Sequence, residues 1–138
     1  MVEAAPSSPT PEVPRVRVVI AEDEANILLD LKETLADEGY EVVGDTGRGD
    51  HAVELVAELD PDVVILDIKM SGLDGIEAAS RIAEAHDAAV VILTACSQRD
   101  LIDRAVEAGA LAYLVKPLHR SESVPAFEVA RARHREMM

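Results

Sequence analysis

From Arg15 onward, the chain alternates between short apolar runs and longer segments in which apolar residues recur with helical spacing. The short runs are rich in valine, isoleucine and leucine, which is typical of strands buried on both faces of a sheet. We therefore predict strands at Val16–Ala21, Tyr40–Thr46, Asp62–Leu66, Ala89–Thr94 and Leu111–Val115.

Helices are predicted after each of these strands. The segment after the first strand has an apolar face made of Ile27, Leu28, Leu31 and Leu35. The predicted helices are Glu24–Gly39, His51–Leu59, Gly75–His86, Gln98–Gly109 and a last one that runs to the C-terminus. The last helix should begin near Ser121 or Ser123, either of which can cap it, with Pro125 in its first turn, where proline is tolerated.

Strict alternation of strands and helices is typical of an α/β fold made of βαβ units. Right-handed crossovers leave few topologies open, and the common five-stranded solution is flavodoxin-like. We predict a (βα)5 three-layer sandwich with a parallel sheet in the strand order 2-1-3-4-5. In such sheets ligands bind beyond the carboxyl ends of the strands where the strand order reverses, here between the first and third strands.

Composition narrows the class of protein further. A chain of 138 residues that is 49% hydrophobic can bury one globular core. The formal net charge of −14 argues against direct binding to nucleic acid or to anionic membranes. The single cysteine excludes a disulfide framework and fits a reducing cytoplasm, and no apolar run approaches the roughly 20 residues of a membrane span.

The first 14 residues stand apart from this pattern. They contain four prolines and have neither a basic start nor an apolar stretch of the kind found in signal peptides. We interpret residues 1–14 as an extended flexible tail and residues 15–138 as the folded domain.

Polar residues gather where the predicted strands end. The first strand is followed by Glu22 and Asp23, and the third runs from four branched apolar residues into Asp67. The fourth ends in Thr94, and the fifth is followed by Lys116. Because the carboxyl ends of parallel strands meet at one edge, we expect three acids, a hydroxyl and an ammonium to lie together there.

Such a cluster is expected to bind a cation. Carboxylates about 4 Å apart repel by roughly 4 kcal/mol per pair at an effective dielectric constant near 20, and Lys116 offsets only part of this charge. A hard divalent ion with oxygen ligands suits the remainder, and Mg²⁺ is the abundant candidate. A phosphoryl group could then be held by the metal, Lys116 and the hydroxyl of Thr94, with Asp67 as the nucleophile that forms an aspartyl phosphate.

The sequence resembles a response-regulator receiver domain from Arg15 to about His134. The order, spacing and strand-end positions of four motifs carry this resemblance: IAEDE (Ile20–Glu24), LDIKMSGLDG (Leu66–Gly75), LTA (Leu93–Ala95) and AYLVKP (Ala112–Pro117). It implies that Asp67 is the phosphoacceptor and that Thr94 and Lys116 contact the phosphoryl group.

The resemblance also implies a magnesium site and a conformational switch. Asp23 and Asp67 would bind Mg²⁺ directly, the backbone carbonyl of Lys69 would be a further ligand, and Glu22 would act through water. Thr94 and Tyr113 would be the switch residues, and the bond from Lys116 to the following proline would be cis. A plain packing role for Tyr113 is the alternative.

A closer resemblance is to the receiver of actinobacterial ANTAR-type regulators, which act in transcription antitermination. It lies in Ala21–Gly44 and in SQRDL (Ser97–Leu101) leading to Ala108–Pro117. In that group a helical RNA-binding domain follows the receiver, and we expect it to be absent from this chain. Ser71 stands where the family usually has proline, which predicts a less rigid loop after the phosphoacceptor, and Leu118 stands where phenylalanine is common.

We therefore predict a two-component response regulator phosphorylated by a sensor histidine kinase. Phosphorylation would change the partner preference of the face formed by the fourth helix, fifth strand and fifth helix, and self-association through this face is one such change. The chain would turn over no external substrate, contact no membrane and bind no nucleic acid by itself. The alternatives are an unphosphorylated docking module and an aspartate-nucleophile phosphatase, which would need a second acid where Lys69 stands.

The remaining reactive side chains have simpler interpretations. We interpret Cys96 as a small loop residue, and the four histidines as solvated because their spacing fits no metal site. The basic residues near the C-terminus are expected to complement the dipole of the last helix, or to begin a helix that leads to an output domain: Arg131, Arg133, His134 and Arg135.

Overall fold

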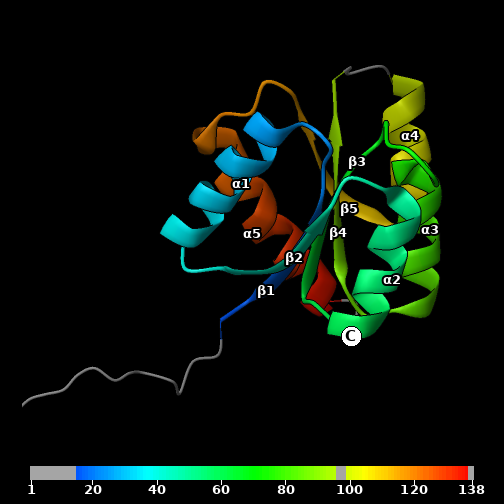
Figure 1. Cartoon of the computed structure of the whole chain (residues 1–138), viewed down its shortest axis with the longest axis horizontal. Helices are drawn as coiled ribbons and strands as arrows, with labels where there is room; N and C mark the ends of the chain where they lie inside the picture. Colours follow the sequence, from blue (N-terminus) through cyan, green and yellow to red (C-terminus); the bar gives the residue numbers. More distant parts are fainter. Residues whose placement is uncertain (1–14, 96–98, 137–138) are drawn as a thin grey trace, which may run out of the picture.

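A parallel five-stranded sheet forms the centre of the molecule in the computed structural model, which describes residues 15–95 and 99–136 (Figure 1). The strand order is β2-β1-β3-β4-β5, as predicted, and every neighbouring pair is parallel. The strands are β1 (Arg17–Ala21), β2 (Glu41–Thr46), β3 (Val63–Asp67), β4 (Ala89–Thr94) and β5 (Ala110–Val115).

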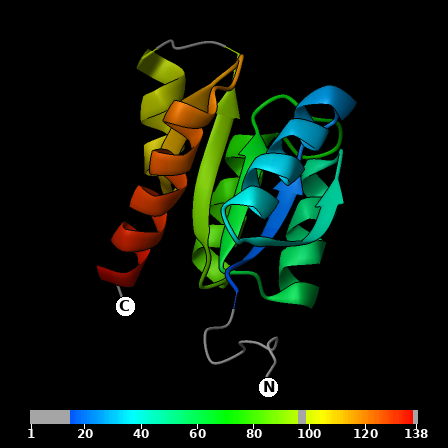
Figure 2. The ribbon, with the colours of Figure 1, turned by 90° about the vertical axis from the view of Figure 1, so that its left-hand side faces the viewer.

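Helices cover both faces of this sheet. They are α1 (Ala25–Asp37), α2 (Gly49–Leu59), α3 (Gly75–Ala85), α4 (Arg99–Glu107) and α5 (Arg120–Glu136). Helices α1 and α5 lie on one face and α2, α3 and α4 on the other (Figures 1 and 2). The flavodoxin-like three-layer fold predicted from the sequence is therefore confirmed. No helix in the described ranges is long and apolar enough to cross a bilayer.

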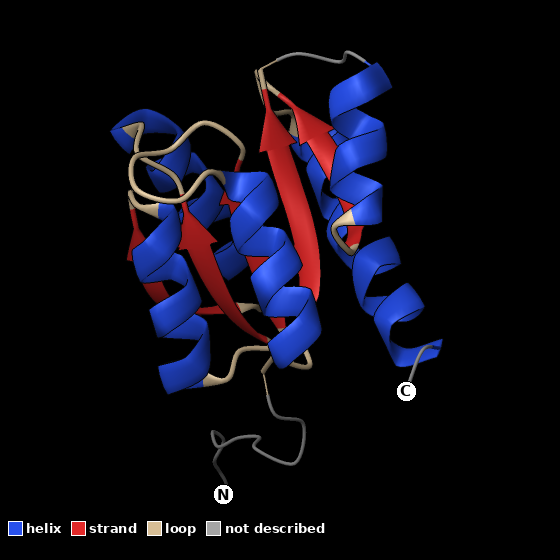
Figure 3. Ribbon diagram, turned by 90° about the vertical axis from the view of Figure 1, so that its right-hand side faces the viewer, coloured by secondary structure: helices blue, strands red, loops and turns tan. Residues whose placement is uncertain are grey.

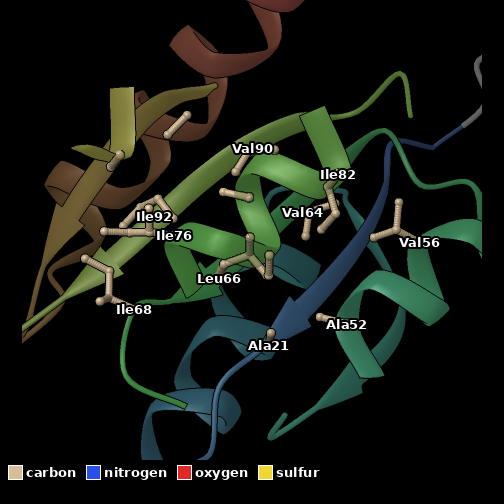
Figure 4. Packing of buried hydrophobic residues seen from close by; sticks show 14 of the residues in the cluster. Ala21, Ala52, Val56, Val64, Leu66, Ile68, Ile76, Ile82, Val90 and Ile92 are labelled. Atoms are coloured by element: carbon tan, nitrogen blue, oxygen red, sulfur yellow. The ribbon is translucent and has the colours of Figure 1, made fainter. Parts of the chain in front are cut away.

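The core consists of two apolar layers separated by the sheet. Alternate residues of β3 point to opposite layers: Val64 and Leu66 pack towards α2 and α3, and Val63 and Ile65 pack towards α1 and α5. Figure 4 shows the first layer, in which Leu66 and Val64 lie among side chains from the neighbouring elements. Because both faces are covered, every residue of β3 is buried, which explains why its sequence is a continuous apolar run.

The start of α5 differs from the prediction. The helix begins at Arg120, so neither Ser121 nor Ser123 precedes it as a cap, and the Ser123 hydroxyl instead donates to the His119 carbonyl at 3.0 Å. Pro125 lies inside the helix and not in its first turn. The predicted start of the helix was wrong because serine and proline are also compatible with a helix that begins earlier. Inside such a helix a serine hydroxyl can donate to the backbone carbonyl four residues before it, as Ser123 does. The helix continues past Pro125 to Glu136, and Figure 3 shows helix up to the C-terminal end of the described chain.

Some predictions fall outside the described residues. These are the flexible tail at residues 1–14, the loop role of Cys96, and the start of the fourth helix at Gln98. Two of the histidines, interpreted as solvated, have partners: the His134 ring lies 2.7 Å from Asp87 Oδ1, and His51 Nδ1 lies 2.9 Å from Thr46 Oγ1.

Two glycines fix the loop that follows β3. The Gly49 amide donates to the Ser71 carbonyl at 3.1 Å, and the Gly75 amide donates to the Ile68 carbonyl at 2.8 Å. A Cβ atom at Gly49 would overlap the Leu73 carbonyl, and one at Gly75 would overlap the Asp67 carbonyl. The loop after Asp67 is thus held at both ends by backbone contacts that only glycine permits.

Gly49→Ala should therefore destabilise the protein. We expect a loss of about 1–3 kcal/mol in the free energy of unfolding, the usual cost of forcing an extra carbon into a packed site. Urea unfolding followed by circular dichroism measures it. Gly47→Ala is the matched control, because its added Cβ meets Asp23 Cβ at 3.3 Å and should cost less. Equal stability of both variants would contradict the close approach described here.

Candidate functional site

The polar residues that follow the strands meet at one edge of the sheet, as predicted. Asp67 and Thr94 are the last residues of β3 and β4, Glu22 follows β1, and Lys116 follows β5. The Lys116 amide donates to the Thr94 carbonyl at 2.8 Å, which continues the β4–β5 ladder and fixes the lysine at the edge. Glu22, Asp67 and Thr94 are all buried, with at most 5% of their surface exposed.

The Lys116 ammonium lies at the centre of this cluster. Its Nζ atom is 2.9 Å from Asp67 Oδ2, 3.0 Å from Glu22 Oε1 and 3.1 Å from Glu24 Oε1. The side chains of Lys116 and Asp67 are 11% and 7% exposed, and that of Glu22 is fully buried. A single buried lysine therefore contacts three carboxylates from two different strand ends.

These contacts change the titration of two of the groups. Burial, together with the nearby negative charge of Asp67, raises the pKa of Glu22 against the lowering effect of the hydrogen bond from the Glu24 amide and of the ion pair with Lys116. Desolvation lowers the pKa of Lys116, but its hydrogen bonds to Asp67 and Glu24 and its ion pair with Glu22 outweigh that effect and raise it. The lysine is held as a cation at any physiological pH.

The cluster fits a divalent cation. Three carboxylates against one ammonium leave a net negative charge at a largely buried site. Glu22, Glu24 and Asp67 each offer an oxygen within 4.8 Å of the others. Glu22 Oε1 is buried and, although 3.0 Å from Lys116 Nζ, has no partner with hydrogen-bond geometry among the described residues. Clustered carboxylate oxygens with unused lone pairs are the donor set that Mg²⁺ prefers.

Asp23 and Glu24 both lie beside the cluster, but only Glu24 contacts Lys116. Asp23 is exposed and lies outside the close group of carboxylates, although it lines the cavity of about 450 Å³ in front of Asp67. Glu24, which the sequence analysis missed, contacts Lys116 and lines the same cavity. Its only sequence signal was its place two residues after Glu22, and the Glu24 amide indeed donates to Glu22 Oε2 at 2.9 Å.

The other predicted residues lie around the same edge. Lys69 lines the cavity, and its amide lies 3.3 Å from Asp67 Oδ1. The Lys116–Pro117 peptide bond is cis. Tyr113 lies apart from the cluster on β5, with 43% of its surface exposed, and borders a separate apolar cavity between α4, β5 and α5.

Comparison with known proteins places this fold and site in context. Residues 18–128 match the family model of the response regulator receiver domain. The transcriptional regulatory protein PdtaR of Mycobacterium tuberculosis is 58% identical over 125 residues, which cover 91% of this chain and 60% of PdtaR. The chain thus spans less than two thirds of that relative.

Solved structures show the same architecture. The signal receiver domain of a modulated diguanylate cyclase from Desulfovibrio desulfuricans superposes with a TM-score of 0.82 at 28% identity, covering 91% of this chain and all of that one. A CheX–CheY–BeF3–Mg complex from Borrelia burgdorferi contains a chain that superposes with a TM-score of 0.77 at 28% identity, covering 81% of this chain and 86% of that one.

Removing the positive charge of the cluster should lower the free energy of unfolding, and removing one of its negative charges should raise it. In buffer without divalent metal, Lys116→Ala should lower the free energy of unfolding by roughly 2–4 kcal/mol, because it leaves buried carboxylates without a counter-charge. Asp67→Asn should raise it, because one of three repelling carboxylates becomes neutral. Urea unfolding in EDTA measures both.

Lys69→Ala is the matched control for Lys116→Ala. Lys69 lines the same cavity, but its side chain is exposed and no carboxylate in the described ranges pairs with its ammonium. Its loss should change stability by less than about 0.5 kcal/mol. If Lys69→Ala and Lys116→Ala were equally destabilising, the central role of Lys116 would be refuted.

Proposed function

This chain belongs to the response regulator receiver family, and from that premise we propose that it is a phosphorylation-driven switch whose acceptor is Asp67. The observation that carries the proposal is the position of the Asp67 carboxylate, which faces a cavity of about 450 Å³ beside Lys116 Nζ at 2.9 Å. The cavity is also lined by Thr94 and Lys69. A nucleophile, a cation and a hydroxyl therefore surround one space large enough for a phosphoryl group.

The residues divide the chemistry of phosphoryl transfer among them. An oxygen of Asp67 attacks the phosphorus of a phosphohistidine on a sensor histidine kinase, the P–N bond breaks, and the electron pair leaves with the imidazole nitrogen. Lys116 turns from the carboxylates towards a phosphoryl oxygen, and the Thr94 hydroxyl donates to another. When Mg²⁺ is bound, it neutralises charge on the transferring group.

We propose that the cation is held by Asp23 and Asp67, with the Lys69 carbonyl as a further ligand and Glu22 acting through water. Asp23 is exposed and lines the cavity, so its carboxylate is accessible to a hydrated ion. Glu24 is a competing ligand, because its carboxylate lies in the close group with Glu22 and Asp67. The exposed carboxylates of Asp23 and Glu24 and the buried carboxylates of Glu22 and Asp67 would then share the ion.

We further propose that phosphorylation acts on the face formed by α4, β5 and α5. Thr94 moves towards the phosphoryl group, and Tyr113, now half exposed, turns into the space that Thr94 leaves. Val106, Tyr113 and Val129 are exposed on this face and would form its contacts with a second copy or another partner.

The output that we propose is control of transcription, by antitermination, in a longer cytoplasmic protein. The support is the identity to PdtaR, a transcriptional regulatory protein, of which this chain spans 60%. RNA binding would then belong to a separate domain of that longer protein. In this proposal the chain acts on no external substrate, and Lys69 occupies the position where an aspartate-nucleophile phosphatase would need its second acid.

Incubation with acetyl phosphate and Mg²⁺ should add one phosphoryl group to the protein, detected by intact-mass spectrometry and mapped to Asp67. Asp67→Asn should show no adduct. Asp74→Asn is the control, since Asp74 accepts from the Glu77 amide at 2.9 Å at the start of α3 and is not part of the Lys116 cluster. An unmodified wild-type protein would favour the docking module, and steady release of phosphate from varied organic phosphates would favour the phosphatase.

Residues 1–138 alone should not bind RNA at physiological salt, whether or not Asp67 is phosphorylated. The net charge of −14 repels a polyanion, and affinity for nucleic acid depends on release of counterions by a basic surface. An electrophoretic mobility shift assay at two salt concentrations tests this. Tight, salt-sensitive binding by this fragment would refute the proposed division of roles between the receiver and an output domain.

A further inference from the structure

The cavity in front of Asp67 continues into a second cavity along α4. The first has a volume of about 450 Å³ and the second about 500 Å³. Asp23, Ile68, Lys69 and Leu101 line both. The two form one trough that starts at Asp67 and passes between the loop after β3 and α4. The phosphoryl group of a small donor would occupy its first part, and the leaving group would extend towards the second.

Arg104 lines the far part of this trough. It lies on α4 one turn after Leu101, and its side chain is exposed. No carboxylate in the described ranges forms an ion pair with its guanidinium, although Asp100 precedes it by one turn and the chain is strongly acidic. Other arginines on the surface do have such partners, among them Arg48 with Asp50 and Arg120 with Asp37. The guanidinium of Arg104 is thus available to a ligand.

We propose that Arg104 is a specificity-determining residue that selects small-molecule phosphodonors with an anionic leaving group, such as acyl phosphates. The inference rests on the proposed function of Asp67. When Asp67 attacks an acyl phosphate, its oxygen forms a new bond to phosphorus and the P–O bond to the acyl group breaks. The electron pair leaves with a carboxylate, so negative charge develops on the departing oxygen, on the side of the trough that faces Arg104.

A donor with a neutral leaving group should not depend on Arg104. In phosphoramidate the nitrogen already carries the proton that it needs, and cleavage of the P–N bond releases neutral ammonia. The same holds for a protonated phosphohistidine, which releases neutral imidazole. A guanidinium stabilises developing anionic charge and does little for a neutral amine. The ratio of rates with the two donors therefore isolates the leaving-group contribution from attraction of the phosphoryl group itself.

The experiment compares phosphorylation of the wild-type chain and Arg104→Gln by acetyl phosphate and by phosphoramidate, with Mg²⁺, over a range of donor concentrations. We expect the acetyl phosphate rate at saturation to fall roughly fivefold, the factor that one exposed charge pair supplies, with the phosphoramidate rate unchanged. Arg104→Lys should restore most of the rate. Arg99→Gln is the matched control, because Arg99 lies on the same helix and lines neither cavity.

The outcomes separate this inference from the function on which it rests. An unchanged donor ratio in Arg104→Gln would overturn the role of Arg104 while leaving Asp67 as the acceptor. Equal slowing with both donors would also overturn it, since the guanidinium would then attract the phosphoryl group and not the leaving group. A change of ratio in Lys69→Ala with none in Arg104→Gln would move the role to the lysine. Failure of the wild-type chain to react with either donor would overturn the proposed function itself.

Discussion

The contact of one ammonium group with three carboxylates is the interaction on which the edge of this sheet depends. Lys116 Nζ lies about 3 Å from Asp67, Glu22 and Glu24, and it fastens the end of β5 to the ends of β1 and β3. The same contact is insufficient by itself, because three negative charges exceed one positive charge and one oxygen of Glu22 stays without a hydrogen bond among the described residues. The ion pairs hold the strand ends together but leave the cluster with a net negative charge, which favours binding of a further cation.

The fold explains why an acid follows such an apolar strand. Residues of β3 are buried because helices cover both faces of the sheet, and Asp67 is the last residue of this strand and its only polar one. The loop beyond it is seated by close backbone approaches at Gly49 and Gly75. The carboxylate itself is held by Lys116 at one oxygen and by the Lys69 amide at the other, which fixes its direction before any ligand arrives.

Most of the fold and of the site was predictable from local sequence, because the apolar runs of a doubly covered sheet and the polar residues at strand ends follow from the architecture itself. Tertiary packing settled the rest. The contact of Glu24 with Lys116 depends on how the chain turns after β1, which no spacing rule fixes. The start of α5 depends on a helix that continues through Pro125. The trough towards Arg104 lies between the loop after β3 and α4, which are far apart in sequence, so it could not be predicted without the folded structure.

Charge balance also links phosphorylation of Asp67, cation binding and a change in the contacts of Lys116, the three events proposed for this edge of the sheet. In the proposed function, a phosphoryl group carrying about −1.5 to −2 charge would replace the single negative charge of the Asp67 carboxylate, so the cluster would become more negative and phosphorylation and cation binding would favour each other. The new oxygens compete with Glu22 and Glu24 for Lys116, and the lysine cannot satisfy all of them. Lys116 directly follows β5, on which Tyr113 lies, and its amide bonds to the Thr94 carbonyl at the end of β4, so a shift of the Lys116 backbone would act on the ends of both strands. Strand β5 therefore connects the charged cluster to the exposed face on which Tyr113 lies. A change in the partners of Lys116 can reach that face through this one strand.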